Sequence, residues 1–293
     1  MQYDSDNGFW LGFSGGKDSQ ALFHLAEIAG VKFKGHFTPT SIDPPQVIRF
    51  IRKQYPEVEF EQLHTSIYKE AIKKRIFPLQ NKRWCCAIFK EQGGAGKVTL
   101  VGVRRQESIQ RSKRNEVEIS DYKFSGSIDS FDEYRKEQIE KELPHINRDI
   151  FAIEKEQTFS CISGKDKIII SPLLDWTSRD VWEFLNKVLR IPHCELYDPP
   201  YNRYRIGCIC CPEATPAQRA RDIALFPYVK KEWIKVAQEF VRCDILSDEQ
   251  REWLLPQGGR PPKVDPEALF YWWVSGKSWS DFIYVYTHPK LEE

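Results

Sequence analysis

The sequence predicts an α/β protein with a parallel-sheet core and a helical C-terminal region. Across the first hundred residues short apolar runs alternate with helical patterns, which is typical of βαβ units. From residue 215 onward the pattern becomes helical and rich in tryptophan, and we expect those tryptophans to pack in a core. We therefore predict an α/β domain over residues 1–212, with a polar insertion at 115–165, and a helical region over 213–293.

Each predicted element follows from a local pattern. Apolar runs give strands at Phe9–Ser14, Lys32–Phe37, Val58–Leu63, Val98–Val103 and Lys167–Ile170. Helical periodicity gives helices at Lys17–Ala29, Pro44–Gln54, Ser66–Lys74, Ser178–Val188, Lys230–Val241 and Pro266–Ser275. Thr177 caps the fourth of these helices, with Asp180 in its first turn. Within the insertion we expect one solvated helix near Asp132–Leu143.

Composition limits the classes of function. The chain has 293 residues, 41% hydrophobic and 29% charged, with a formal net charge of +1. These values are typical of a soluble globular protein, and contact with nucleic acid would need a local basic patch. The first residues lack the pattern of a signal peptide, and no apolar run reaches the roughly 18 residues of a membrane helix. We expect a cytoplasmic protein, without a membrane partner, whose eight cysteines are thiols or metal ligands.

The sequence Ser14-Gly15-Gly16-Lys17-Asp18-Ser19 joins the first strand to the first helix. Glycines let backbone N–H groups approach an anion closely, and the helix N-terminus adds further unpaired N–H groups. Lysine supplies a cation and the two serines supply hydroxyls. The loop therefore predicts a phosphate site, and the alternative is an ordinary Gly-Gly turn.

Cysteine spacing gives a second motif. The pair Cys85-Cys86 and the later Cys208-x-x-Cys211 together provide four thiolates, the number that a [4Fe–4S] cluster takes. Zn²⁺ is the alternative, although adjacent cysteines rarely both bind one zinc ion. A third interpretation is that these cysteines are small buried hydrophobic residues. Cys210 leaves the ligand choice open, because it could replace Cys208 or Cys211.

A basic run follows the fourth predicted strand. It extends from Gly102 to Arg114 and contains Arg104, Arg105 and Arg111. Ligands bind at the edge where parallel strands end, and arginine side chains suit phosphate. The run therefore predicts a site for a nucleotide or pyrophosphate, with a solvated basic helix as the alternative.

Four motifs together resemble one family. The loop at 14–19, the segment from Gly102 to Arg111, Pro172–Trp182 and the stretch from Leu196 to Cys211 resemble, in order, segments of the phosphoadenylyl-sulfate (PAPS) reductase family. The resemblance covers residues 8–212 and implies the PP-loop (adenine nucleotide alpha hydrolase-like) fold of the ATP pyrophosphatase superfamily. Adenylyl-sulfate reductases of this family hold a [4Fe–4S] cluster on a cysteine pair and a C-x-x-C, which favours the same four positions here.

Two departures change the activity that the resemblance implies. The reductases use a catalytic cysteine near the C-terminus, whereas the last cysteine here is Cys243. The loop also carries Lys17 and Asp18, as in members that cleave ATP. We therefore expect an enzyme that adenylates an acceptor, converting ATP to AMP and pyrophosphate, to support sulfur transfer. Its character is closest to the ATP pyrophosphatases of DNA phosphorothioation and tRNA thiolation.

The resemblance also implies roles for individual residues. The phosphates of ATP are expected on the loop residues Ser14, Gly15, Gly16, Lys17, Asp18 and Ser19. Lys17 neutralises the leaving group, and Asp18 helps to hold Mg²⁺. Arg104, Arg105 and Arg111 bind pyrophosphate or an acceptor phosphate. Gly102 is expected to belong to the nucleotide-binding residues, and Asp43 lies on the adenosine side. The expected partners are an adenine nucleotide, a nucleic-acid acceptor, and a cysteine desulfurase or other sulfur donor.

Two other functions stay open. The first is a sulfonucleotide (PAPS/APS) reductase with Cys210 or Cys243 as its nucleophile. The second is a non-catalytic iron–sulfur or nucleic-acid-binding component of a modification complex.

Overall fold

The computed structural model describes residues 8–80, 83–120, 125–126, 167–242 and 265–276. The chain divides into two compact units. The first contains residues 1–38, 45–62 and 89–206, and the second contains residues 39–44, 63–88 and 207–293. The helix expected near Asp132–Leu143 lies outside the described residues. The domain boundary between residues 212 and 213 stays a prediction.

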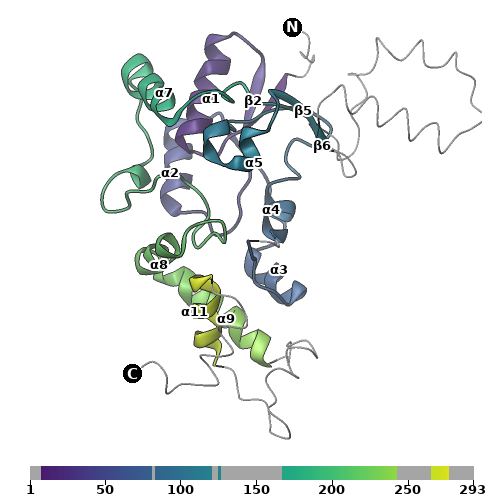
Figure 1. The fold of residues 1–293 in the computed structure, drawn as a ribbon, viewed down its shortest axis with the longest axis vertical. Coiled ribbons are helices and arrows are strands. Elements are labelled where there is room, and N and C mark those ends of the chain that lie inside the picture. The colour runs from purple at the N-terminus through teal and green to yellow at the C-terminus, as the bar shows by residue number, and fades with distance from the viewer. Residues whose placement is uncertain (1–7, 81–82, 121–124, 127–166, 243–264, 277–293) are drawn as a thin grey trace, which may run out of the picture. The chain divides into compact units, whose positions relative to one another are not determined.

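The first unit is built on one sheet, which confirms the predicted α/β class (Figure 1). Its described strands, in the order β3-β2-β1-β4-β7-β5-β6, are β3 (Glu59–Phe60), β2 (Phe33–Phe37), β1 (Phe9–Gly12), β4 (Val98–Leu100), β7 (Lys167–Ile170), β5 (Val117–Ser120) and β6 (Ser125–Gly126). The strands from β3 to β7 in this order pair in parallel, whereas β5 pairs antiparallel with both β7 and β6.

The strand order reverses beside β1. Leu11 of β1 lies opposite Gly35 of β2 on one side and opposite Leu100 of β4 on the other. The chain thus builds β2 and β3 on one side of β1, and β4 and β7 on the other. Open α/β sheets bind their ligands at such a switch point, outside the carboxyl ends of the strands. The loops that follow β1, β4 and β7 are therefore the natural place for a site.

Helices of the first unit cover this sheet and shape its edge. They are α1 (Lys17–Ile28), α2 (Pro45–Gln54), the 3₁₀ turn η1 (Arg105–Glu107), α5 (Ile109–Ser112), α7 (Ser178–Glu183), the π-helical η3 (Phe184–Leu189) and the 3₁₀ turn η4 (Glu195–Tyr197). Close packing of α1 on β2 requires a glycine at Gly35. A Cβ atom there would lie 3.0 Å from Val58 and 3.3 Å from Phe23 of α1.

Strand β5 begins inside the predicted polar insertion. Val117 and Ile119 alternate with Glu116 and Glu118, and Ile119 is buried. This alternation is the pattern of a half-buried strand. Residues 117–120 therefore extend the sheet, and residues 121–124 and 127–166 lie outside the described part of the chain.

The second unit is helical around an aromatic core. Its helices are α3 (Ile67–Lys74), α4 (Trp84–Phe89, which belongs to this unit through Ile88), α8 (Pro216–Leu225), α9 (Pro227–Arg242) and α11 (Pro266–Ser275). Figure 1 shows α8, α9 and α11 gathered together. Trp233 and Trp273 are buried with ring centroids 4.8 Å apart, and Phe77 stacks on Trp273 at 5.1 Å. The predicted packing role of these two tryptophans is confirmed.

No helix in the described residues has both the length and the apolar character needed to cross a membrane.

Candidate functional site

The loop between β1 and α1 is a braced turn that ends at the helix N-terminus. Gly15 has φ +71°, and a Cβ atom there would lie 3.0 Å from Val47 and 3.1 Å from Ile51. Gly16 is the N-cap of α1, and as a glycine it has no side chain that could accept a capping hydrogen bond. The Ser19 hydroxyl donates to the Gly16 carbonyl at 2.9 Å and lies 3.2 Å from the Ser14 hydroxyl. Hydrogen bonds among the loop's own residues thus hold the turn in place.

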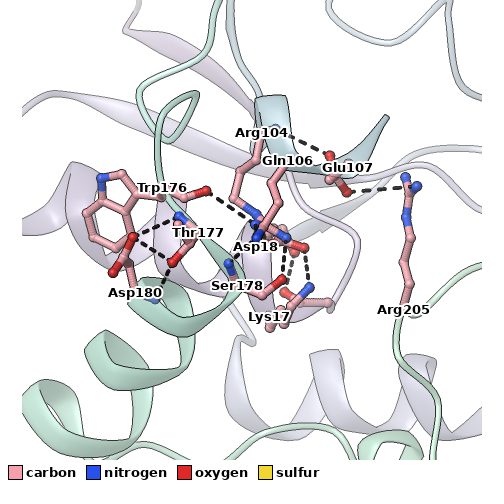
Figure 2. A network of polar contacts seen from close by, with 12 residues as sticks. Lys17, Asp18, Arg104, Gln106, Glu107, Trp176, Thr177, Ser178, Asp180 and Arg205 are labelled. Atoms are coloured by element: carbon pink, nitrogen blue, oxygen red, sulfur yellow. Dashed lines mark hydrogen bonds and ion pairs between the residues drawn. The ribbon is translucent and has the colours of Figure 1, made fainter. Parts of the chain in front are cut away.

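Two buried cations meet on Asp18 (Figure 2). Lys17 Nζ lies 2.9 Å from one carboxylate oxygen and Arg104 Nε lies 2.6 Å from the other. Both cationic residues are only 1% exposed. The structure therefore brings together three of the predicted catalytic residues. Lys17 and Asp18 begin α1, and Arg104 lies in the segment between β4 and η1.

Arg104 is held by further bonds within the protein. Its Nη1 donates to Gln106 Oε1 at 3.2 Å and to the Trp176 carbonyl at 3.3 Å. Its Nη2 donates to Ser178 Oγ at 3.1 Å. These acceptors lie in the loops after β4 and β7, so the guanidinium joins both loops to the start of α1. The two terminal nitrogens of its guanidinium group donate to protein acceptors, whereas an arginine that binds phosphate directs them to the ligand.

Gly102 follows β4 and allows the chain there to lie close to the backbone of the loop at 14–19 and the start of α1. A Cβ atom at this position would lie 2.9 Å from the Asp18 carbonyl oxygen and 3.0 Å from its carbon. These are backbone atoms, so no flexible side chain can move aside. The backbone at Gly102 thus lies against the start of α1, and its expected role in nucleotide binding stays a prediction.

A second carboxylate organises the other arginines. Glu107 pairs with Arg111 and lies 3.8 Å from Arg205, and it accepts the Arg104 amide at 3.3 Å. Burial lowers the pKa of Arg111, with Arg205 acting in the same direction and Glu107 opposing it. Arg105 differs from its neighbour because it points to the surface and pairs with Asp175. Figure 2 shows Arg205 facing Glu107 from the opposite side to Arg104.

Two tyrosines contact Lys17. The Tyr197 hydroxyl accepts the Lys17 amide at 2.8 Å. The Tyr204 ring centroid lies 5.5 Å from Lys17 Nζ, and its hydroxyl lies 3.1 Å from Ser178 Oγ. Sequence reasoning did not name as site residues a set that the structure places here, namely Gln106, Glu107, Ser178, Tyr197, Tyr204 and Arg205. All six belong to the motifs that carry the family resemblance, and this was the available signal.

Asp43 belongs to the second unit and not to the unit of the phosphate loop. Its carboxylate accepts a hydrogen bond from the Thr40 amide.

All four predicted cysteine ligands belong to the second unit. Cys85 and Cys86 lie on α4, and Cys208 and Cys211 precede α8. A hydrogen bond to Cys86 raises the pKa of the Cys85 thiol, with burial and the charges of Cys86, Cys208 and Cys211 acting in the same direction. We call these four residues the cysteine group. All four side chains are partly exposed, and the Cys208 sulfur lies 3.3 Å from the Thr40 hydroxyl.

Cys210 points elsewhere. It is buried with φ +56°, its sulfur lies 3.9 Å from the Arg219 carbonyl, and its amide donates to Asp222 at 2.8 Å. These contacts place Cys210 in the interior of the unit. Among the described residues, the histidine, cysteine and acidic side chains form no group of three or more in a metal-binding arrangement. The cysteine group thus has the right chemistry for a metal centre without a formed coordination geometry.

A family model describes this combination of fold and motifs. The model of the phosphoadenosine phosphosulfate reductase domain matches residues 8–214, which is more than two thirds of the chain. The chain belongs to this family. The resemblance seen in the sequence is thereby confirmed.

The chain is also similar to an uncharacterized protein of Methanocaldococcus jannaschii. It is 27% identical over 232 residues, which make up 78% of this chain and 47% of the relative. The chain thus spans about half the length of this relative. Members of the reductase-domain family are nucleotide-related sulfur-transfer enzymes of the PP-loop superfamily. The loop at 14–19 follows β1 at the switch point of the sheet, where open α/β sheets bind their ligands.

Proposed function

We propose that the protein is an ATP pyrophosphatase that adenylates an acceptor and so prepares it for sulfur transfer. One observation carries the proposal: Lys17 follows the two-glycine turn at the switch point of the sheet, and its ammonium is fixed by Asp18. A lysine at a phosphate loop balances the charge of a polyphosphate that leaves, and a sulfonucleotide has no pyrophosphate to release.

The proposed reaction is a displacement at phosphorus. A nucleophilic atom of the acceptor attacks the α-phosphorus of ATP, and the bond to the bridging oxygen between the α and β phosphates breaks with its electron pair. Pyrophosphate leaves with the added negative charge, and AMP stays on the acceptor. The amides at the start of α1 and the Lys17 ammonium would stabilise that charge, which is the main way in which such sites accelerate the reaction.

Asp18 is better suited to position cations than to bind Mg²⁺. One of its oxygens faces Lys17 and the other faces Arg104, both at hydrogen-bonding distance. A third cation at this carboxylate would be repelled by the two already present. We therefore propose that Mg²⁺ enters with the nucleotide phosphates, and that Asp18 and Arg104 hold Lys17 in place.

The remaining arginines are proposed to serve the acceptor side. Arg105 and Arg205 are the more exposed of them, and Arg111 is held by Glu107. Guanidinium groups bind phosphate in a two-pronged manner, so a nucleic-acid acceptor would fit this edge. The nature of the acceptor and a sulfur donor such as a cysteine desulfurase belong to the proposal.

The activity test compares Lys17→Ala with Lys187→Ala, which removes an exposed lysine of η3. AMP and pyrophosphate are measured from ATP with transfer RNA or duplex DNA as acceptor. We expect Lys17→Ala to lose about a hundredfold or more in turnover, because one lost stabilising donor commonly costs that much. Lys187→Ala should behave as the wild type.

Two results would contradict the proposal. Turnover of PAPS to sulfite with thioredoxin would identify a sulfonucleotide reductase instead. A wild-type protein that supports modification in a complex while Lys17→Ala does so equally well would identify a non-catalytic component.

We further propose that the cysteine group binds a [4Fe–4S] cluster. The donor set supports this, since four thiols are the ligands that such a cluster requires. The Cys86 hydrogen bond, burial and the neighbouring sulfurs raise the pKa of Cys85, so a bound cationic centre would be needed to stabilise its thiolate form. The cluster could be structural or could carry sulfur, and no step of the reaction is assigned to it.

Anaerobic purification followed by iron, sulfide and zinc analysis tests this assignment. We expect about four iron and four sulfide per chain in the wild type. Cys85→Ser should lose most of the iron, whereas Cys194→Ser, outside the group, should keep it. Stoichiometric zinc without sulfide would replace the cluster by the zinc alternative, and a metal-free protein would remove both.

A further inference from the structure

One loop contacts the proposed phosphate site through a series of tyrosines. We call residues 196–205 the tyrosine loop. It is closed by a backbone hydrogen bond of 2.9 Å from the Arg203 amide to the Leu196 carbonyl. Its three tyrosine hydroxyls bond three different parts of the first unit. The partners are the Lys17 amide for Tyr197, the Gln46 side chain for Tyr201 and the Ser178 hydroxyl for Tyr204.

Tyr197 occupies the helix N-terminus. Its hydroxyl accepts the Lys17 amide, the first of α1, at 2.8 Å. It also lies 3.4 Å from the point where a Cβ atom of Gly16 would stand, so it rests directly on the two-glycine turn. Burial raises the pKa of Tyr197, which keeps the hydroxyl neutral. A phosphate oxygen bound to this amide would have to take the same place.

Tyr204 covers the lysine side chain. Lys17 is 1% exposed, whereas Tyr204 is 75% exposed and its ring lies over Lys17 Nζ. A large aromatic side chain that is so exposed gains little from burial of its own surface. Its position is fixed by the Ser178 bond and by the lysine beneath it. The ring therefore separates the ammonium from solvent, where a polyphosphate would approach.

We propose that the tyrosine loop occupies the phosphate cradle in the absence of ligand, and that a polyphosphate must displace the Tyr197 hydroxyl and the Tyr204 ring to bind. This inference rests on the proposed function, because it assumes that the loop at 14–19 is the phosphate site. The substrate contacts of Lys17 are then made only after displacement.

The displacement favours polyphosphates over the adenylate product. A charged phosphate oxygen accepts a hydrogen bond about twice as strong as one accepted by a neutral hydroxyl. It would therefore replace the Tyr197 hydroxyl as the acceptor of the Lys17 amide. The β and γ phosphates of ATP supply such oxygens, and so does free pyrophosphate. AMP carries its phosphate at the α position, outside the cradle, and leaves the tyrosine loop in place.

Equilibrium binding of ATP, pyrophosphate and AMP to the full chain tests the inference. Tyr197→Phe removes the competing hydroxyl and keeps the ring. We expect ATP and pyrophosphate to bind about fivefold more tightly, which corresponds to the loss of one competing hydrogen bond. AMP affinity should stay unchanged.

Two companion variants sharpen the test. Tyr204→Ala uncovers Lys17 at an exposed position, so ATP should associate several times faster in stopped-flow measurements. Tyr201→Phe is the matched control, since it removes a hydroxyl of the same loop that bonds Gln46 and not the cradle. It should leave all three affinities unchanged.

Weaker binding of ATP to Tyr197→Phe would show that the hydroxyl is a phosphate ligand and would overturn the inference. Unchanged binding, or no binding of pyrophosphate by either protein, would overturn it as well. Tighter binding together with an absence of pyrophosphate release from ATP would support the inference while contradicting the proposed activity, so the two failures are distinguishable.

Discussion

At the scale of single residues, Asp18 fixes the charge arrangement of the phosphate loop. Its two oxygens pair with Lys17 and Arg104, which are both buried, so one negative charge is shared between two cations. Loss of the partner of a buried cation strongly destabilises the folded state, because water cannot replace the lost interaction. The carboxylate is therefore needed for stability as well as for the position of Lys17.

We predict that Asp18→Asn lowers the free energy of unfolding by about 3–5 kcal/mol, the cost of breaking a buried ion pair. Urea denaturation measures this change. Asp175→Asn is the control, since it breaks the exposed Arg105–Asp175 pair and should cost at most about 1 kcal/mol. Equal effects of the two substitutions would mean that burial does not govern the Asp18 interaction.

Neighbouring arginines show the limit of sequence reasoning at this scale. Arg104 and Arg105 stand side by side in the basic run, and both were predicted to bind phosphate. In the structure Arg104 has extended backbone angles and points inward to Asp18, whereas Arg105 points outward to Asp175. Arg104 is the last extended residue before the 3₁₀ turn that begins at Arg105, so the two side chains leave the chain in different directions. Which direction is interior depends on the packing of other elements.

At the scale of elements, local patterns predicted most helices well. Helix α7 begins at Ser178 as expected, and Thr177 and Asp180 form the reciprocal cap. Helix α11 has the predicted bounds. The signals for these starts lie within four residues, so they act whatever the surroundings are. Past Glu183 the predicted helix continues as a π-helix, which its sequence does not indicate.

We predict that Thr177→Ala destabilises the protein by about 1 kcal/mol through loss of the α7 cap. Thermal or urea denaturation measures this loss. Thr177→Ser keeps a hydroxyl that can accept the Asp180 amide, so it should stay close to the wild type. A serine variant as unstable as the alanine variant would indicate that the methyl group, and not the cap, is responsible.

The same cap should respond to acid. Hydrogen bonds from the Thr177 amide and hydroxyl lower the pKa of Asp180 from its ordinary 3.8. A carboxylate with a lowered pKa contributes its full stability above that ordinary value and loses it as the pH falls through the lowered one. The stability difference between wild type and Asp180→Asn should therefore be constant near neutral pH and shrink below 3.8. A difference that grows in acid would contradict this assignment.

At the scale of the whole molecule, the chain forms two units that are interleaved in sequence. Residues 39–44 and 63–88 join the C-terminal residues in the second unit. The cysteine group thus assembles from α4 and from the turn before α8, which are more than a hundred residues apart in the chain. Composition gives no sign of such interleaving, because it depends on long-range contacts.

We predict that Trp233→Ala destabilises the second unit by about 3–5 kcal/mol, since it removes a fully buried aromatic side chain. Tyr228→Ala, at a half-exposed position of the same helix, should cost far less. Denaturation followed by tryptophan fluorescence compares the two. Equal costs would mean that the aromatic core contributes little to the unit.

The sequence by itself determined the α/β class, the two-glycine loop between the first strand and the first helix, the main helix starts and the family. The elements and the loop depend on residues close together in the chain, whose backbone preferences and periodicity act locally, and the family depends on four such local motifs in a fixed order. Only the tertiary structure decided that Asp18 pairs with both Lys17 and Arg104, that Cys210 faces the interior, and that Tyr197 rests on the loop. These contacts join residues that sheet order and helix packing bring together. The free energy of a buried charge or hydroxyl depends on the groups packed around it, which the local sequence does not specify.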